Sequence, residues 1–451
     1  MMGIIFPVNS KIFSGKRGTG LKVAAIIAEY NPFHKGHAYQ IKELRSRTGA
    51  DYIVVVMSGD FVQRGEPAIY DKHTRALMAL HAGVDLVLEL PVCFATGSAN
   101  DFASCGVALL DRLGVVGTLC FGTESGDLCQ LSQLALVLGQ EPAEYVDELQ
   151  KRLRQGMSFP KARSLALLHY FSPDPSSPSP FGPDWGEMLS SPNNILAVEY
   201  LRALKKRGSP IAPLAIRRFG QAYHDEGMPD ASSYASASAI RKAIKEGCLP
   251  WAYSQVPLKT AALMQGALPV WPGNKPWAKP TPIFPDDLTP LLNHRLLELP
   301  HAGLLARFLD MSPELAARLE KNSLYFDTFS GRVSQLKTRG YTYTRVSRAL
   351  LHVLLNITAE QAACFKSLDY VAYARILGFS RHAGPLLSHI KRNASLPLVT
   401  KTANARKILG DDGLAMLQTE FYASHLYQSL IFAKSLRRVP NEYSCPVAVL
   451  H

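Results

Sequence analysis

Apolar runs of strand length alternate with helical periodicity along the first half of the chain. The runs lack apolar–polar alternation, as expected of strands buried on both faces; they cover residues 23–28, 51–57, 85–90, 118–122 and 214–218. Helical patterns cover residues 72–82, 100–113 and 193–205. Strands that alternate with helices predict an α/β fold with a Rossmann-like, doubly wound parallel sheet, whose ligands bind beyond the carboxyl ends of the strands.

The rest of the chain divides by composition. Residues 291–451 are mostly helical in pattern, down to about Lys434, and residues 251–290 are proline-rich and predict an irregular connection. Residues 1–20 fit no domain pattern and are expected to be a disordered extension, since their apolar piece is too short for a signal peptide. Proline and serine crowd residues 170–186, which predicts a flexible insertion in an α/β domain of residues 21–250.

The charge is unevenly distributed. Lys and Arg exceed Asp and Glu by 12, but residues 331–410 alone hold 13 Lys and Arg and only two acids. Aromatic residues are interleaved with this charge, a combination that suits the phosphates and unpaired bases of RNA loops; a solvated basic face over core aromatics is the alternative. Within it we expect RNA contacts from Lys337, Arg339, Tyr341, Tyr343, Arg345 and Arg348.

Other features limit the class of protein. Seven cysteines without a CxxC pair predict neither a disulfide framework nor a zinc site, and we expect buried thiols in a reducing compartment. No apolar run reaches the roughly 18 residues of a membrane span, so we expect a cytoplasmic protein without a membrane partner. No obligate protein partner is evident.

The most informative stretch follows the first strand. His34, Gly36 and His37 stand where a strand passes through a tight turn into a helix, and the N-terminus of a helix favours phosphate. Residues three apart share a helix face, so both imidazoles can meet one ligand, and Gly36 leaves room for a flat ring or a ribose. Core histidines are the alternative interpretation.

This stretch resembles the HxGH motif of the nucleotidylyltransferase superfamily, whose members bind ATP and act at its α-phosphate. Further segments resemble the tRNA(Met) cytidine acetate ligase family: residues 29–34 (EYNPFH), 57–67 (MSGDFVQRGEP), 191–196 (SPNNIL), 223–225 (YHD) and 337–345 (KTRGYTYTR). Because these matches run from about residue 22 to about residue 410, the resemblance covers most of the chain. It implies a sheet of the nucleotidylyltransferase type and a helical, basic, tRNA-binding domain over residues 291–451.

The resemblance also implies roles for residues. It makes His34 and His37 catalytic, as donors to phosphate oxygens in the transition state. The expected ATP-binding residues are Ala28, Glu29, Tyr30, Asn31, Pro32, Phe33, His34, Lys35, Gly36, His37, Gly122, Asn194, Arg217 and Arg218. Three questions stay open at this point: which of Arg217 and Arg218 meets the triphosphate, whether Asn193 replaces Asn194, and whether Glu29 acts directly.

Two neighbouring segments add candidates. Arg64 in the 58–67 loop could bind a phosphate or a carboxylate, and residues 231–242, with Arg241 and Lys242, resemble the signature that closes over the triphosphate. No cluster of acids has Mg²⁺ spacing, so we expect no protein metal site and a Mg²⁺ ion that arrives with ATP.

The implied reaction joins acetate to RNA. Acetate would attack ATP to give acetyl-adenylate and pyrophosphate, and N4 of the wobble cytidine of elongator tRNA(Met) would take the acetyl group. Two alternatives remain: a small-molecule adenylyltransferase of the same superfamily, and a non-catalytic RNA-binding protein. The long basic helical region argues against the first, and the intact His34, Gly36 and His37 against the second.

Overall fold

The computed structural model describes residues 20–157, 159–171, 188–189, 191–218, 234–270, 279–299 and 301–450. The expected extension, most of the expected insertion, residues 223–225 and the start of the 231–242 segment lie outside these ranges.

Five parallel strands form the centre of the molecule, in the order β5-β2-β1-β6-β7. They are β1 (Val23–Ala28), β2 (Tyr52–Ser58), β5 (Leu86–Leu90), β6 (Thr118–Thr123) and β7 (Ala212–Arg217). The predicted doubly wound sheet is confirmed, with strand ends within about two residues of those expected. Because β1 pairs with both β2 and β6, the strand order reverses at β1, and ligands of such sheets bind beyond that point.

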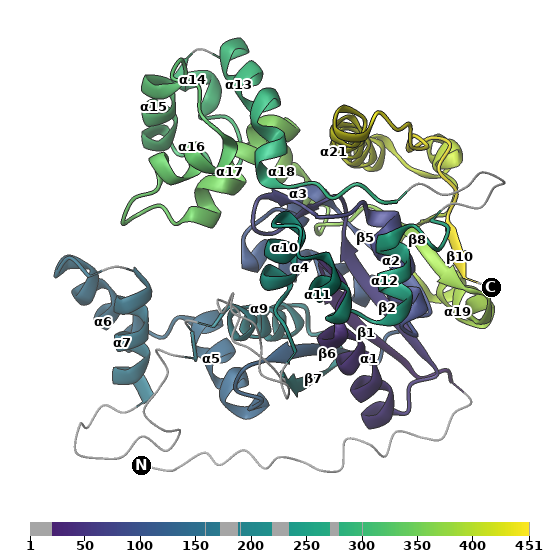
Figure 1. Ribbon diagram of the computed structural model, residues 1–451. Helices are drawn as coiled ribbons and strands as arrows, with labels where there is room; N and C mark the ends of the chain where they lie inside the picture. Colours follow the sequence, from purple (N-terminus) through teal and green to yellow (C-terminus); the bar gives the residue numbers. More distant parts are fainter. Residues whose placement is uncertain are drawn as a thin grey trace, which may run out of the picture.

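Helices cover both faces of the sheet, as the two sides of β1 show. Ala24 and Ile26 face a core with α1 (Lys35–Thr48), α2 (Lys72–His81), α10 (Ala237–Lys245), α11 (Leu249–Ser254) and α12 (Leu258–Gln265). Ala25 and Ile27 face a second core with α3 (Val92–Ala95), α4 (Ala99–Arg112), α5 (Leu128–Gln140) and α9 (Pro192–Arg207) (Figure 1). Residues buried on alternate sides explain why the strands show no polar alternation.

The prediction of an irregular connection was wrong for the part that forms α11 and α12. Pro250 lies in the first turn of α11, and Pro257 is the N-cap of α12. Proline is tolerated at the start of a helix, because the N–H that it lacks would have no intrahelical partner there.

The C-terminal region is mostly helical, as predicted. Its helices are η1 (Pro285–Leu288), α13 (Thr289–Glu298), α14 (Ala302–Leu305), α15 (Pro313–Asn322), α16 (Phe329–Leu336), α17 (Tyr343–Leu355), α18 (Ala359–Ser367), η2 (Arg381–Ala383), α19 (Gly384–Asn393), η3 (Thr402–Asn404), α20 (Ala405–Ile408) and α21 (Asp411–Ser435). It also holds strands that the sequence analysis did not predict. β8 (Ala374–Ser380) pairs antiparallel with β5, and β9 (Leu398–Val399) and β10 (Ala448–Leu450) pair with β8. Residues beyond 291 therefore extend the central sheet.

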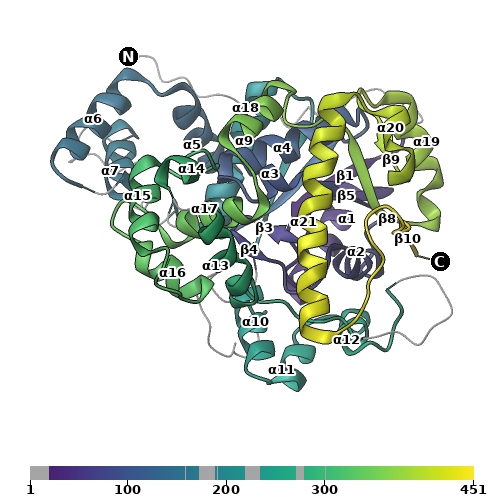
Figure 2. The same cartoon turned by 90° about the horizontal axis from the view of Figure 1, so that it is seen from above.

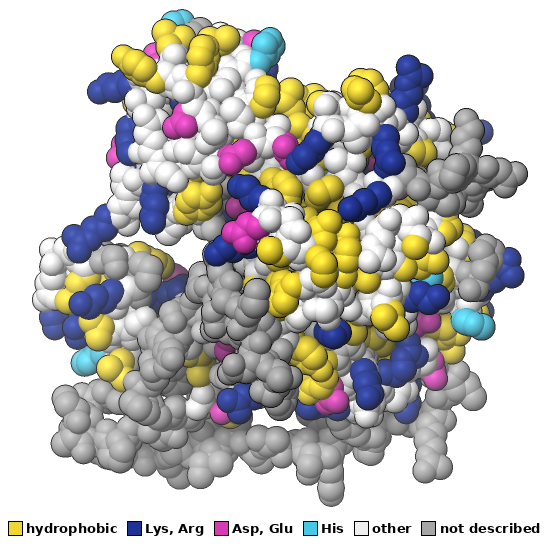
Figure 3. Space-filling view, viewed as in Figure 1, with side chains coloured by type: hydrophobic (Ala, Val, Ile, Leu, Met, Phe, Trp, Pro, Cys, Tyr) yellow, Lys and Arg dark blue, Asp and Glu magenta, His cyan; other side chains and the backbone are white. Residues whose placement is uncertain are grey.

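Two groups of helices project on the same side of the sheet (Figures 1 and 2). One group is α13–α17; the other is a pair formed by α6 (Ala143–Arg154) and α7 (Phe159–Phe171), which we call the α6–α7 hairpin. The space-filling view is hollowed between them, with Lys and Arg side chains on both sides of the hollow (Figure 3).

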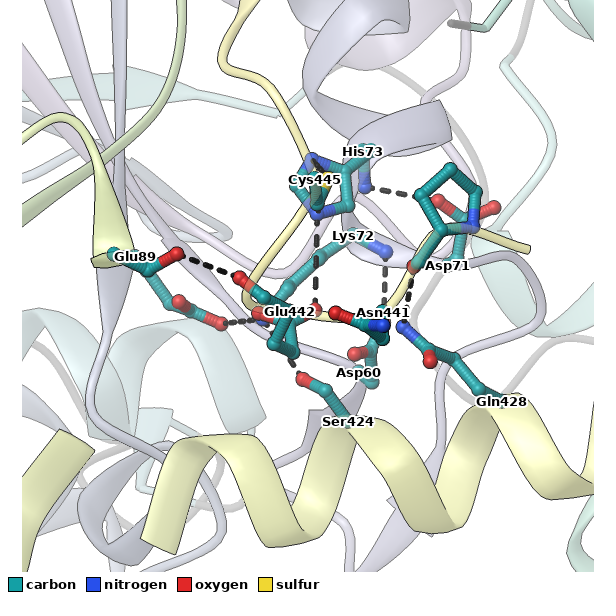
Figure 4. Close-up of polar contacts among 12 residues, drawn as sticks. Asp60, Asp71, Lys72, His73, Glu89, Ser424, Gln428, Asn441, Glu442 and Cys445 are labelled. Carbon is teal, nitrogen blue, oxygen red and sulfur yellow. Dashed lines mark hydrogen bonds and ion pairs between the residues drawn. The ribbon is translucent and has the colours of Figure 1, made fainter. Parts of the chain in front are cut away.

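A buried network of ion pairs joins the C-terminal tail to the sheet. Lys72 Nζ lies 2.7 Å from Glu89 Oε1 and 3.0 Å from Glu442 Oε2, and it donates to Ser424 Oγ of α21 (Figure 4). Arg375 of β8 pairs with the same two carboxylates, and all four charged side chains are at most 3% exposed. Two cations therefore balance two anions inside the protein.

The structure contains free cysteines and no described helix that could span a membrane. All seven cysteines are free, but only Cys93, Cys105 and Cys120 are buried, so the expectation of buried thiols was wrong for exposed Cys129, Cys248 and Cys364. In the described part of the chain, no helix has the length and apolarity to cross a membrane.

Candidate functional site

A pocket of about 170 Å³ lies beyond the carboxyl ends of β1, β6 and β7. Its walls come from the β1–α1 turn, the loop at residues 63–64, the end of β6, the start of α9, the end of β7 and the start of α10. This is the edge of the sheet at which the strand order predicts a ligand.

The two histidines of the motif are locked together at the start of α1. His34 is its N-cap, and its Nδ1 accepts a hydrogen bond from Gly36 N at 3.0 Å. His37 Nδ1 accepts from His34 N at 3.2 Å, and the two rings stack with centroids 3.7 Å apart. Because both Nδ1 atoms accept, a neutral imidazole at either position carries its proton on Nε2.

Burial keeps both imidazoles neutral at pH 7. It lowers the pKa of His34 to about 3, with Arg218 and Arg241 adding to the shift. It also holds the pKa of His37 well below its usual value, with further lowering by His34 and Arg218. Each ring therefore offers an Nε2–H donor in a setting of positive charge, which is suited to phosphate oxygens.

Gly36 has a role that the sequence analysis did not predict. A Cβ at this position would lie 2.9 Å from His34 Cε1 and 3.0 Å from His34 Nδ1. The His34 ring thus occupies the place that a Cβ at residue 36 would need, and Gly36 itself lines the pocket. The glycine permits the imidazole to fold back and cap the helix.

Four arginines line the same pocket: Arg64, Arg217, Arg218 and Arg241. Both candidates at the end of β7 therefore reach it. Arg241 Nη1 donates to Asn31 O at 2.7 Å, which ties α10 to the β1–α1 turn. A Cβ at Gly122 would lie 3.2 Å from Arg218 Cγ, so this glycine lets Arg218 pass close over the end of β6.

The other expected residues divide into two sets. Ala28, Glu29, Tyr30, Asn31 and Gly122 line the pocket together with the histidines and Gly36. Pro32, Phe33, Lys35 and Asn194 do not appear in its lining.

Each residue outside the lining has its own surroundings. Phe33 is buried against Tyr30, with ring centroids 4.8 Å apart, and Lys35 is exposed. Asn194 is buried, and its Oδ1 accepts from Glu124 N at 3.0 Å and from Ser125 N at 3.4 Å. It therefore fixes the loop that follows β6, while neighbouring Asn193 lines the pocket. A direct contact of Asn194 with ATP stays a prediction.

One important residue escaped the sequence analysis. Arg75 of α2 is fully buried, and its guanidinium donates to backbone oxygens of Glu29, Ser58 and Tyr70 at 2.5, 3.1 and 2.9 Å. It holds the ends of β1 and β2 in place behind the pocket. An arginine inside the apolar face of a helix was the available signal, because such a side chain is buried only where partners satisfy it.

The 58–67 loop connects the pocket to α17. Its strands β3 (Phe61–Val62) and β4 (Glu66–Pro67) pair antiparallel, and Gln63 and Arg64 line the pocket. Ser347 Oγ of α17 donates to Gly65 O at 2.9 Å, and a Cβ at Gly65 would lie 2.3 Å from Arg348 N. The two segments are in direct backbone contact.

The residues expected to bind tRNA have mixed surroundings. Lys337 and Arg339 are exposed, and Arg345 lies over the Tyr341 ring, 5.0 Å from its centroid. Arg348 instead pairs with Asp310 at 2.9 Å.

The basic segment at residues 331–410 does not form one surface. Arg332 and Arg375 are buried, and Lys366 pairs with Asp101. Its later cations lie on and around α19 and α20, at the opposite end of the molecule from α15–α17 in Figure 2. The charge near α16 and α17 is therefore smaller than the sequence suggested.

No group of three His, Cys, Asp or Glu side chains that could hold a metal ion occurs among the residues described.

Comparison with known proteins gives consistent results. Residues 21–441 match the family described as HIGH Nucleotidyl Transferase. The chain is 37% identical to the tRNA(Met) cytidine acetate ligase of Caldanaerobacter subterraneus, over 90% of this chain and 95% of that protein. It is 35% identical to the tRNA(Met) cytidine acetate ligase of Acetivibrio thermocellus, over 95% and 100%.

Solved structures agree with these sequence relatives. The apo structure of Thermotoga maritima TmcAL matches with a TM-score of 0.84 and 30% identity, over 95% of this chain and all of that one. The structure of the same protein bound with alpha-thio ATP matches with a TM-score of 0.82.

Proposed function

The chain belongs to the family of tRNA(Met) cytidine acetate ligases, and on that premise we propose that it binds ATP in the pocket beyond β1 and uses it to join acetate to a cytidine of tRNA. The finer assignment is to N4 of the wobble cytidine of elongator tRNA(Met), with N4-acetylcytidine as the product. The proposed location is the cytoplasm, where ATP and tRNA occur.

The observation that carries this proposal is the pair of neutral imidazoles in a pocket lined by arginines. His34 and His37 each have Nε2–H available to a phosphate oxygen, because their Nδ1 atoms are held by backbone N–H groups. Arg217, Arg218 and Arg241 supply the compensating positive charge for a triphosphate. Such fixed donors stabilise charge that grows in a transition state without reorganisation.

In the first step an acetate oxygen attacks the α-phosphorus of ATP. The bond from that phosphorus to the bridging oxygen of the β-phosphate breaks, and pyrophosphate leaves with the bonding electrons. Acetate is already a nucleophile, so positioning matters more than proton transfer. The histidines and arginines hold the phosphates, and Mg²⁺ would enter with ATP on its phosphate oxygens.

In the second step the cytidine N4 attacks the acyl carbon of acetyl-adenylate. The carbon–oxygen bond to the phosphate breaks, AMP leaves, and one N4 proton is lost. We propose that tRNA reaches the pocket along the side that carries Lys337, Arg339 and Arg345. Arg345 lies on α17, and Ser347 and Arg348 of α17 contact the 58–67 loop that lines the pocket.

Incubation with radiolabelled acetate, ATP and bulk tRNA tests the proposal. We expect label in tRNA that depends on ATP, together with acetate-dependent exchange of pyrophosphate into ATP. Label that stops at acetyl-adenylate would support adenylation but reject tRNA as the acceptor. Absence of label from both would overturn the proposed function.

A further inference from the structure

Beyond α16 and α17, a second cationic surface faces the same side of the molecule. From Leu149 to Phe171 the sequence has five Lys and Arg residues and no Asp or Glu. These cations are Lys151, Arg152, Arg154, Lys161 and Arg163. They lie on the last turn of α6 and the first half of α7, at the end of the α6–α7 hairpin.

Charge is segregated along α6. Glu144 and Asp147 lie in its first half, and Asp147 is seven residues, or about 10 Å, from Arg154. Lys151 and Arg152 share the carboxylate of Glu148, at 3.3 and 2.6 Å. Arg154 and Lys161 are exposed, and neither has an ion pair within the described ranges.

The helix dipole explains the cations at the end of α6 but not those at the start of α7. Cations in the last turn of α6 are favoured by the negative end of its dipole, but Lys161 is the third residue of α7, at the positive end. A cation there is disfavoured by the dipole, and no acidic residue in that turn offsets this effect. A polyanionic ligand at the hairpin end would offset this cost.

An exposed aromatic ring lies among these charges. Phe159 is 53% exposed, and the Arg163 guanidinium lies over its ring at 5.7 Å. Tyr145 of α6 and Ala162, Ala166 and Leu167 of α7 are buried, and α6 and α7 pack against each other. A flat exposed ring flanked by cations matches the requirements of an unpaired base and its phosphates.

The chain connects the hairpin to two walls of the pocket. It lies in the chain between Gly122 and Asn193, both of which line the pocket. The hollow in Figure 3 separates it from the α13–α17 group, and Lys and Arg side chains lie on both sides. Several cations of the 331–410 segment are buried, paired or distant from α16 and α17. The exposed cations of the α6–α7 hairpin add positive charge on the side of the molecule that carries α16 and α17.

We propose that the α6–α7 hairpin is a second RNA-binding element, which contacts tRNA phosphates through Arg154 and Lys161 and stacks an unpaired base on Phe159. The tRNA then lies between this hairpin and the α16–α17 side while its cytidine reaches the pocket. This inference rests on the proposed function for the identity of the RNA.

Filter binding of tRNA at several salt concentrations tests it with three proteins: the parent, Arg154→Ala/Lys161→Ala and Phe159→Ala. The salt slope is the slope of the logarithm of the binding constant against the logarithm of the salt concentration. The double variant should make it less steep by about 1.4 units, at about 0.7 for each lost contact with single-stranded RNA. Phe159→Ala should keep the slope but lower affinity about 5- to 160-fold, as loss of one stacked base does.

A matched control is Lys391→Ala/Arg392→Ala. These cations also lie exposed in the last turn of a helix, but α19 is at the opposite end of the molecule from α6 in Figures 1 and 2. The control should bind tRNA with the parent slope, and thermal melting should be equal for all the proteins.

The outcomes separate the two proposals. If the parent transfers labelled acetate to tRNA but the hairpin variants bind as the control does, the hairpin proposal is overturned and the function stands. If the parent binds tRNA through the hairpin but transfers no acetate, the hairpin proposal stands and the function fails.

Discussion

At the scale of single residues, the site depends on how two imidazoles are held. The sequence analysis singled out His34 and His37 because their spacing after a buried strand resembles a known motif, with core histidines as the alternative. It could not show that the rings stack or that both Nδ1 atoms accept from backbone N–H groups. Those facts depend on χ angles and on the turn geometry, which residue types alone do not specify.

His37→Ala should abolish most adenylate formation and leave tRNA affinity within a few-fold of the parent. Removing a donor that acts in the transition state costs on the order of 10²–10³ in rate. Acetate-dependent exchange of pyrophosphate into ATP measures it. His301→Ala is the control, since that side chain is 77% exposed. Exchange at the parent rate in His37→Ala would remove His37 from the reaction.

Gly36→Ala should also impair exchange, although it removes no functional group. The added Cβ would lie 2.9 Å from His34 Cε1, so the ring must turn and release its bond from Gly36 N. We expect exchange to fall at least tenfold, since a displacement of about 1 Å can cost on the order of 10² in rate.

Gly139→Ala provides the comparison for Gly36→Ala. A Cβ at Gly139 in α5 meets nothing within 4 Å, so the change should leave exchange unaltered and raise the melting temperature slightly. Parent-like exchange in Gly36→Ala would show that the folded-back His34 ring is not needed.

At the scale of elements, burial decided what the sequence could predict. The ends of strands such as β2 were predicted to within about two residues, because an uninterrupted apolar run has few other interpretations. β8 was missed because Arg375 and Gly378 interrupt its apolar pattern. The structure explains both residues: Arg375 is paired inside the protein, and a Cβ at Gly378 would lie 2.9 Å from Leu80 Cδ1 of α2.

Gly65→Ala tests the contact between the 58–67 loop and α17. Gly65 has φ +78, and its Cβ would lie 2.3 Å from Arg348 N, so the loop must separate from the helix. Since Gln63 and Arg64 move with it, we expect a higher KM for ATP in the exchange assay and a lower melting temperature.

Gly83→Ala is the matched control for this variant. Gly83 has φ +97 but no atom within 4 Å of its Cβ position, so alanine there suffers backbone strain alone. The two variants should lose similar stability from strain, and only Gly65→Ala should raise KM. Equal kinetics in both would mean that the docking of the loop on α17 does not shape the pocket.

At the scale of the whole molecule, distant segments of the chain complete one sheet and one charge network. Lys72 and Glu442 are 370 positions apart in the chain, yet their side chains are 3.0 Å apart and buried. Sequence patterns cannot predict such a pairing, because either residue alone resembles a solvated surface charge. The sequence analysis likewise expected a mostly helical C-terminal region and none of its strands, although the last strand belongs to the central sheet.

Glu442→Gln tests whether the network holds the C-terminal tail to the sheet. The change leaves Lys72 and Arg375 buried with one carboxylate, and breaking a buried pair costs about 3–5 kcal/mol. Urea unfolding at pH 7 should show that loss, whereas Glu298→Gln, whose side chain is 50% exposed, should change stability by less than about 0.5 kcal/mol.

The pH dependence of unfolding gives the same variant a second test. Lys72 and Arg375 hold the pKa of Glu442 well below its usual value against the opposing effect of burial. Near pH 4 the unfolded chain then binds a proton that the folded protein does not, so acid favours unfolding. The stability from Glu442 is present above about pH 4.3, the ordinary pKa of glutamate, and is lost below it. The difference between the parent and Glu442→Gln should therefore stay nearly constant between pH 7 and about pH 5, and shrink as the pH falls below about 4.3. A constant difference would mean that the glutamine acts by altered packing and not by loss of charge.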